Sequence, residues 1–292
     1  MDDDRSKWCF HTLGTYINHD DWHKTPEGKD YFASILRHGK RRVFGCLESP
    51  LTLVPSHLEQ PKIMKYKLCL VGKTGVGKSS TVAKLCGQRV PTTHVETPGI
   101  ITSVTYWPAK LKHSGKHVMF RLQFWDAGHA VQRKFDHIHP ACREKAQAVL
   151  YFFSFIDRSS FEDLRTQFSK SLSNEDTPLL VVIGTKYDQY NRSEITSREL
   201  LDFQKQWQVP ILKLKNVLKP TETNALLAGD SCAEIDDVAP VMNTLVEYLW
   251  IHDQVLSGNI ELSSSPKLNT SREEETHSAS DRDSDEDEAT YV

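Results

Sequence analysis

The sequence has few of the features that mark secreted, membrane-spanning or zinc-binding proteins. Its six cysteines form no C-x-x-C pair and have no histidine partner at zinc-ligand spacing. Its longest apolar run, residues 148–156 with one serine in it, is too short to cross a bilayer. The start, MDDDRSKWCF, lacks the apolar core of a secretory leader. We therefore expect reduced cysteines, a buried strand within this run and a cytoplasmic location.

Lipid attachment sites and a clustered basic surface are also missing. Met1 is followed by aspartate instead of glycine, and no cysteine follows Cys232, so we expect no direct lipid anchor. The formal net charge is −3, but residues 257–292 hold ten acidic and three basic side chains, which leaves +4 for residues 1–256. Nucleic-acid binding needs basic groups gathered on one face, so we expect no nucleic-acid partner.

The composition divides the chain into three parts. Residues 1–62 form an N-terminal extension, in which residues 25–27 have the chemistry of a helix start. Apolar side chains then share one face of the expected amphipathic helix: Tyr31, Phe32, Ile35 and Leu36. Residues 257–292 are acidic and serine-rich with almost no large apolar groups, so we expect a disordered tail.

Residues 63–256 alternate between strand-like and helix-like segments. Strands are expected at 63–71, 101–107, 118–125, 148–155, 179–184 and 211–214, and helices at 78–85, 160–173, 197–206 and 238–256. This alternation predicts an α/β domain with a mostly parallel, six-stranded sheet and helices on both faces. The strands expected at 101–107 and 118–125, joined by a turn at 114–115, would form an antiparallel pair at one edge of the sheet.

A phosphate-binding motif lies between the first expected strand and the first expected helix. Residues 72–79, the phosphate loop, read GKTGVGKS and match G-x-x-x-x-G-K-[ST]. Glycines let backbone N–H groups surround a β-phosphate, the Lys78 ammonium would bridge β- and γ-phosphate oxygens, and the Ser79 hydroxyl would ligate Mg²⁺. The expected nucleotide contacts here are Thr74, Gly75, Val76, Gly77, Lys78, Ser79 and Ser80.

The residues that would recognise the base follow two later strands. Residues 185–188, the guanine motif, read TKYD, in which the Asp188 carboxylate can accept from two guanine N–H groups and the Lys186 stem can lie along the base. Thr185 stands where asparagine is usual, so it keeps a hydroxyl but loses the amide that ties this loop to the phosphate loop. Residues 213–216, the base loop, read KLKN. Only Lys215 matches the pattern that is usual for a base-binding loop after the last strand, and the alternative is that these residues are a solvated strand end.

Two further segments have the form of switches that respond to a γ-phosphate. Residues 96–100, the first switch segment, read ETPGI; Thr97 would give its hydroxyl to Mg²⁺ and its N–H to the γ-phosphate, with Glu96 beside it. Residues 123–131, the second switch segment, read QFWDAGHAV, in which Asp126 would support Mg²⁺ and Gly128 would sense the γ-phosphate. The expected metal ligands are therefore Ser79, Thr97 and Asp126.

These motifs occur in the order of the Ras superfamily, and residues 157–164, DRSSFEDL, are similar to Rab proteins. Five shorter runs resemble the Rem- and Rab-like small GTPases of the ciliogenesis and planar polarity effector group: DWH at 21–23, EGK at 27–29, RRVFG at 41–45, FDH at 135–137 and KYDQY at 186–190. The resemblance implies a Ras-like P-loop fold that binds GTP or GDP with Mg²⁺. It also implies recognition in the GTP state by the Inturned and Fuzzy proteins at the basal body, in cilium formation and targeted transport of cargo or vesicles.

The second switch segment departs from the family pattern Trp-Asp-Thr-Ala-Gly-Gln by one missing residue. If Gly128 keeps the glycine role, His129 takes the position of the glutamine that orients the attacking water. If the spacing D-x-x-G is kept instead, His129 sits at the glycine and Ala130 at the glutamine. Both alignments remove the glutamine, and the β-branched Thr74 would crowd the γ-phosphate, so we expect slow hydrolysis. His129 is either a weak catalytic group or a solvated histidine.

Three function classes follow from these motifs. The first is a GTP-loaded switch that recruits a partner and reaches membranes only through that partner. The second is a conventional hydrolytic Rab-like trafficking GTPase, and the third is a pseudo-GTPase scaffold that binds no nucleotide. Lys78, Ser79 and Asp188 argue against the third class, because a scaffold has no use for them.

Overall fold

The computed structural model describes residues 16–19, 21–33, 54, 58–88, 90–91, 93, 95–128, 142–171, 178–217 and 231–260 of the 292-residue chain. His129, Ala130, the helix face expected at Ile35 and Leu36, and the tail from residue 261 onward lie outside the described residues.

The described residues form a six-stranded sheet with the strand order β2-β3-β1-β4-β5-β6. Its strands are β1 (Lys62–Val71), β2 (Ile100–Lys110), β3 (His117–Ala127), β4 (Ala148–Ser154), β5 (Leu179–Thr185) and β6 (Ile211–Lys213). All neighbours pair in parallel except β2 and β3, which pair antiparallel and leave β2 at one edge. The expected sheet is confirmed, including its antiparallel edge.

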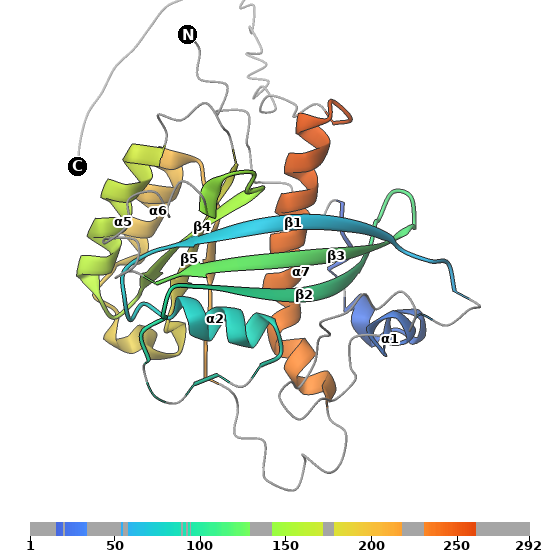
Figure 1. Cartoon of the computed structure of the whole chain (residues 1–292), viewed down its shortest axis with the longest axis horizontal. Coiled ribbons are helices and arrows are strands. Elements are labelled where there is room, and N and C mark those ends of the chain that lie inside the picture. The colour runs from blue at the N-terminus through green and yellow to red at the C-terminus, as the bar shows by residue number, and fades with distance from the viewer. Residues whose placement is uncertain are drawn as a thin grey trace, which may run out of the picture.

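Helices cover both faces of this sheet (Figure 1). They are α1 (Pro26–Ala33), α2 (Lys78–Leu85), α5 (Arg158–Ser171), α6 (Ser197–Trp207) and α7 (Ser231–Leu256), with short 3-10 helices η3 (Trp22–Lys24) and η5 (Tyr187–Arg192). Alternate residues of β1 point to opposite faces. Leu68 and Leu70 pack in the cluster that contains α2 and α7, whereas Cys69 and Val71 pack with α5 and α6.

The last helix is longer than the sequence pattern predicted, because it begins at Ser231 instead of near residue 238. Pro240 lies inside it, although an interior proline costs a backbone hydrogen bond. The proline is exposed, while Ile235 and Val238 before it and Met242 after it are buried on one face. Burial of this continuous apolar face offsets the lost bond.

Helix α1 packs against β2, and Figure 1 places it away from α5 and α6. The Gly28 N–H donates to the Thr25 hydroxyl (3.0 Å), so the expected helix start is confirmed. Phe32 packs edge-on to Trp107 of β2, with ring centroids 5.0 Å apart. The Lys110 ammonium lies 2.6 Å from a Glu27 carboxylate oxygen and ties α1 to β2.

Residues 16–19 form an N-terminal strap that the sequence pattern did not reveal. The strap extends the sheet edge beyond β2, because Ile17 pairs antiparallel with Leu111. On its other side the strap contacts α7. A carboxylate oxygen of the buried Glu247 accepts from the N–H groups of Tyr16 (2.9 Å) and Ile17 (3.1 Å), and the second oxygen lies 2.7 Å from His19 Nε2.

Candidate nucleotide-binding site

The phosphate loop connects β1 to α2 through backbone conformations that favour glycine. A Cβ atom at Gly72 would lie only 2.6 Å from the carbonyl oxygen of Phe152 on the neighbouring strand β4. Gly75 and Gly77 have φ values of +79° and +99°, in the left-handed region that other residues rarely adopt. The loop therefore takes this shape because glycine stands at these positions, as the motif predicts.

Lys78 is the first residue of α2, and its side chain is buried against the phosphate loop. Its ammonium donates to the carbonyl oxygens of Gly72 (2.8 Å) and Lys73 (2.9 Å), which hold it over the loop. Burial lowers the pKa of Lys78, and the nearby Asp126 carboxylate opposes that shift. A buried ammonium next to the N-terminus of a helix forms a site that favours a phosphate anion.

The three residues expected to support Mg²⁺ lie together, although they come from α2, the first switch segment and the end of β3. The Ser79 hydroxyl donates to an Asp126 carboxylate oxygen (2.5 Å) and lies 2.9 Å from the Thr97 hydroxyl. The other Asp126 oxygen is buried and has no hydrogen-bond partner among the described residues. Two hydroxyls and one carboxylate with an unpaired oxygen fit Mg²⁺, which prefers few protein oxygens and completes its shell with phosphate and water.

The two switch segments touch at Gly128. Its N–H donates to the carbonyl oxygen of Gly99 (2.9 Å). A Cβ atom at position 128 would overlap the carbonyl oxygen of Thr97, so the position accepts only glycine. This contact favours the alignment in which Gly128 keeps the glycine role and His129 follows it. Glu96 is exposed, with no hydrogen bond or ion pair to the described residues.

The guanine motif lies at the end of β5, and its first residue corrects one expectation. The hydroxyl of the buried Thr185 donates to the carbonyl oxygens of Phe153 (3.1 Å) and Val76. Thr185 therefore ties the guanine motif to the phosphate loop without an amide. Lys186 has a left-handed backbone (φ +55°), and it leads into η5, where the Asp188 carboxylate is exposed.

The base loop gives Lys215 no described side-chain partner, because this side chain is exposed and only its carbonyl oxygen is used, by the Lys84 ammonium. The next residue, Asn216, contacts Thr81 of α2, a contact that the sequence analysis missed. The only sign of this role of Asn216 in the sequence was its position next to Lys215. The roles of these site residues in nucleotide binding stay predictions.

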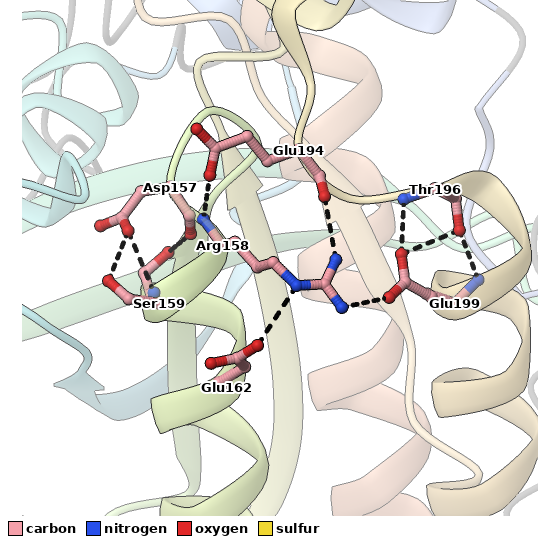
Figure 2. Close-up of polar contacts among 8 residues, drawn as sticks. Asp157, Arg158, Ser159, Glu162, Glu194, Thr196 and Glu199 are labelled. Carbon is pink, nitrogen blue, oxygen red and sulfur yellow. Dashed lines mark hydrogen bonds and ion pairs between the residues drawn. The ribbon is translucent and has the colours of Figure 1, made fainter.

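A second polar network lies at the start of α5, where Figure 2 shows Asp157, Arg158 and Ser159 and their partners, and Lys73 of the phosphate loop contacts it. The Lys73 ammonium donates to the Ser159 hydroxyl (2.6 Å), which donates to Asp157 (2.6 Å). The next residue, Arg158, extends the network toward α6. Its guanidinium donates to the carbonyl oxygen of Glu194 (3.1 Å) and to the carboxylate of Glu199 (2.8 Å).

The contact between Arg158 and Glu199 should make the stability of the fold depend on pH in the acid range. The hydrogen bond from Arg158 lowers the pKa of Glu199 to about 2, from an ordinary value of 4.5. The carboxylate therefore stabilises the fold fully above pH 4.5, and the contribution is lost as pH falls toward 2. We expect Glu199→Gln to lower the thermal unfolding midpoint by about 2 °C at pH 6 and by less at pH 3.5.

Glutamine keeps an oxygen for the Thr196 N–H, so Glu199→Gln tests the charge and not the helix cap. Glu162→Gln removes another carboxylate beside Arg158 and serves as the matched control. An effect of Glu199→Gln that is equal at both pH values would show that the ion pair contributes nothing.

The sequence of this chain is similar to a known protein family and to several known proteins. Residues 67–217 match the model of the Ras family. The chain is 47% identical to Ciliogenesis and planar polarity effector 2 of Xenopus laevis over 82% of this chain and 94% of that protein. The human protein of the same name is 45% identical over 81% of this chain and 90% of its own length. Rab-27B of Bos taurus is 26% identical over 54% of this chain and 76% of its own length.

In the part of the chain that the structure describes, no helix has both the length and the apolar character needed to cross a membrane.

Proposed function

The chain belongs to the Ras family and to its ciliogenesis and planar polarity effector group, and from this we propose that it is a guanine-nucleotide switch that acts in cilium formation. One observation carries the proposal. Ser79, Thr97 and Asp126 meet within hydrogen-bonding distance beside the buried Lys78, although they come from three separate segments. This arrangement suits the phosphates of a nucleotide and its metal ion.

Each part of the site has a role in this proposal. The phosphate loop N–H groups and Lys78 hold the β- and γ-phosphates, while Asp188 accepts the N–H donors of guanine. When bound, Mg²⁺ would neutralise phosphate charge beside Ser79, Thr97 and Asp126. Because Gly128 touches the backbone of Thr97, the state of the γ-phosphate would be felt by both switch segments together.

We also propose that hydrolysis is slow. Neither alignment of the second switch segment supplies a glutamine. The β-branched side chain of Thr74, half-exposed in the phosphate loop, would crowd the γ-phosphate. Large exposed apolar side chains lie in the first switch segment and on both sides of it: Ile100 is 38% exposed, Val95 73% and Ile101 45%, and they suit recognition by a protein partner. A long-lived GTP state that presents this surface fits a recruiter better than a rapidly cycling enzyme.

The partners and place of action are proposed from the resemblance. We place the protein at the base of the cilium, where its GTP state engages the Inturned and Fuzzy proteins and supports targeted transport. Contact with membranes would come through these partners. We propose an N-terminal extension over residues 1–62, a GTPase domain over residues 63–256 and an acidic tail over residues 257–292.

The nucleotide that remains bound after purification separates the three function classes. We expect GTP to be retained, because the proposed site would hold the phosphates, while neither alignment of the second switch segment supplies the glutamine that orients water. Single-turnover hydrolysis with Mg²⁺ should then be slower than that of a Rab protein measured in parallel. Bound GDP with a Rab-like rate would favour the conventional hydrolytic GTPase, and the absence of any bound or exchangeable nucleotide would favour the scaffold.

A further inference from the structure

Two side chains connect the base loop to the phosphate-binding helix α2. The Lys84 ammonium of α2 donates to the carbonyl oxygen of Lys215, and the Asn216 side chain of the base loop contacts Thr81. The Asn216 Nδ2 lies 2.9 Å from the hydroxyl of Thr81, and that hydroxyl lies 3.3 Å from Oδ1 of the same amide. Nδ2 is also 3.5 Å from the carbonyl oxygen of Gly77, at the outer limit of a hydrogen bond. Thr81 lies in the first turn of α2, and its side chain is buried.

The chemistry of Thr185 explains why a second connection is needed. A threonine hydroxyl carries one proton, and two carbonyl oxygens, those of Val76 and Phe153, already share it. Thr185 therefore has no further donor with which to hold the base loop. A side-chain amide has two donors and one acceptor, and within 185–188 and 213–216 Asn216 is the only residue that has one.

The two side chains converge on the same residue of the phosphate loop. A Cβ atom at Gly77 would lie 3.3 Å from Asn216 Nδ2 and 3.5 Å from the Thr185 hydroxyl oxygen. Thr185 thus reaches the phosphate loop from the guanine motif, and Asn216 reaches the same place from the base loop. Together they connect both base-binding segments to the loop that holds the phosphates.

We propose that Asn216 is a positioning residue for the nucleotide, whose amide takes over the connection that the missing asparagine at position 185 would make. The proposal rests on the proposed nucleotide binding. A nucleotide that contacts both ends of the site leaves faster when the base loop can move away from the phosphate loop. Contacts that hold a site in its binding arrangement act chiefly by slowing dissociation.

Dissociation of a fluorescent GDP derivative from the full-length chain, chased with excess unlabelled GDP, tests this. We expect Asn216→Ala to speed dissociation by about tenfold, because a partly buried hydrogen bond is lost and the Thr81 hydroxyl loses that partner. Thr81→Val removes the facing hydroxyl and should speed it comparably. The double variant should be no faster than the faster single variant, because both remove the same contact.

Asn191→Ala, at an exposed asparagine of η5, is the matched control and should dissociate at the wild-type rate. A rescue variant separates positioning from general stability. Thr185→Asn, introduced into Asn216→Ala, should return dissociation to within about threefold of wild type, because it restores an amide beside Gly77.

Three results would overturn the proposal: an Asn216→Ala rate within about twofold of wild type, additive effects in the double variant, or no rescue by Thr185→Asn. Failure of the proposed function looks different, because the wild-type chain would then bind no labelled GDP.

Discussion

Replacing Lys78 by alanine is expected to weaken binding of GDP and GTP by at least about 100-fold. The ammonium is buried, is aimed over the phosphate loop by the carbonyl oxygens of Gly72 and Lys73, and lies next to the N-terminus of α2. Without the Lys78 ammonium, the β- and γ-phosphates would be desolvated but would lack this positive charge. The loss of binding free energy is therefore larger than for a lysine on the surface. Titration of the purified chain with labelled nucleotide measures the change.

A neighbouring lysine provides the matched control for this prediction. Lys73 also belongs to the phosphate loop, but its ammonium is directed to the Ser159 hydroxyl, so Lys73→Ala should weaken binding only by about threefold. Similar losses in the two variants would show that total positive charge matters and not the position of Lys78. Circular dichroism of the nucleotide-free variants checks that both remain folded.

The pH dependence of nucleotide binding should follow the same lysine. Burial lowers the pKa of Lys78 in the free protein, whereas bound phosphate favours its charged form. Affinity should therefore be highest below the lowered pKa and should decline as pH rises through it. Lys78→Ala should remove this decline.

Replacing Glu247 by alanine is expected to destabilise the fold by about 3 kcal/mol. This carboxylate is fully buried, and it accepts the N–H groups of Tyr16 and Ile17 and lies beside His19. Without it two backbone donors lose their acceptor, and the N-terminal strap loses its hydrogen bonds to α7. Urea unfolding followed by circular dichroism measures the loss.

Two further variants identify the cause of that loss. Glu247→Gln keeps an acceptor oxygen for the backbone donors and should cost about half as much. Deleting residues 1–19 removes the donors themselves, so Glu247→Ala should add little to the effect of the deletion. Additive losses would mean that Glu247 stabilises α7 by a route independent of the N-terminal strap.

Patterns among neighbouring residues in the sequence were enough to predict most of the fold and part of the candidate site. Strand and helix periods repeat every two or 3.6 residues, so a short window is enough to reveal them. The helix of residues 78–85 was predicted at its observed bounds, and the phosphate loop was recognised because eight consecutive residues supply its glycines, its lysine and its hydroxyl. Where local rules competed with packing, as at Pro240 in α7, the sequence interpretation placed the boundary wrongly.

Contacts between distant segments were decided only by the tertiary structure. The sequence predicted an α/β domain with a phosphate loop and named Ser79, Thr97 and Asp126 as ligands of one metal ion. The contacts among these three side chains are visible only in the structure. The sequence also could not show that Asn216 meets Thr81, or that Glu247 holds the N-terminal strap. These partners are 135 and 231 residues apart, so their meeting depends on strand order and helix packing, which no local pattern encodes.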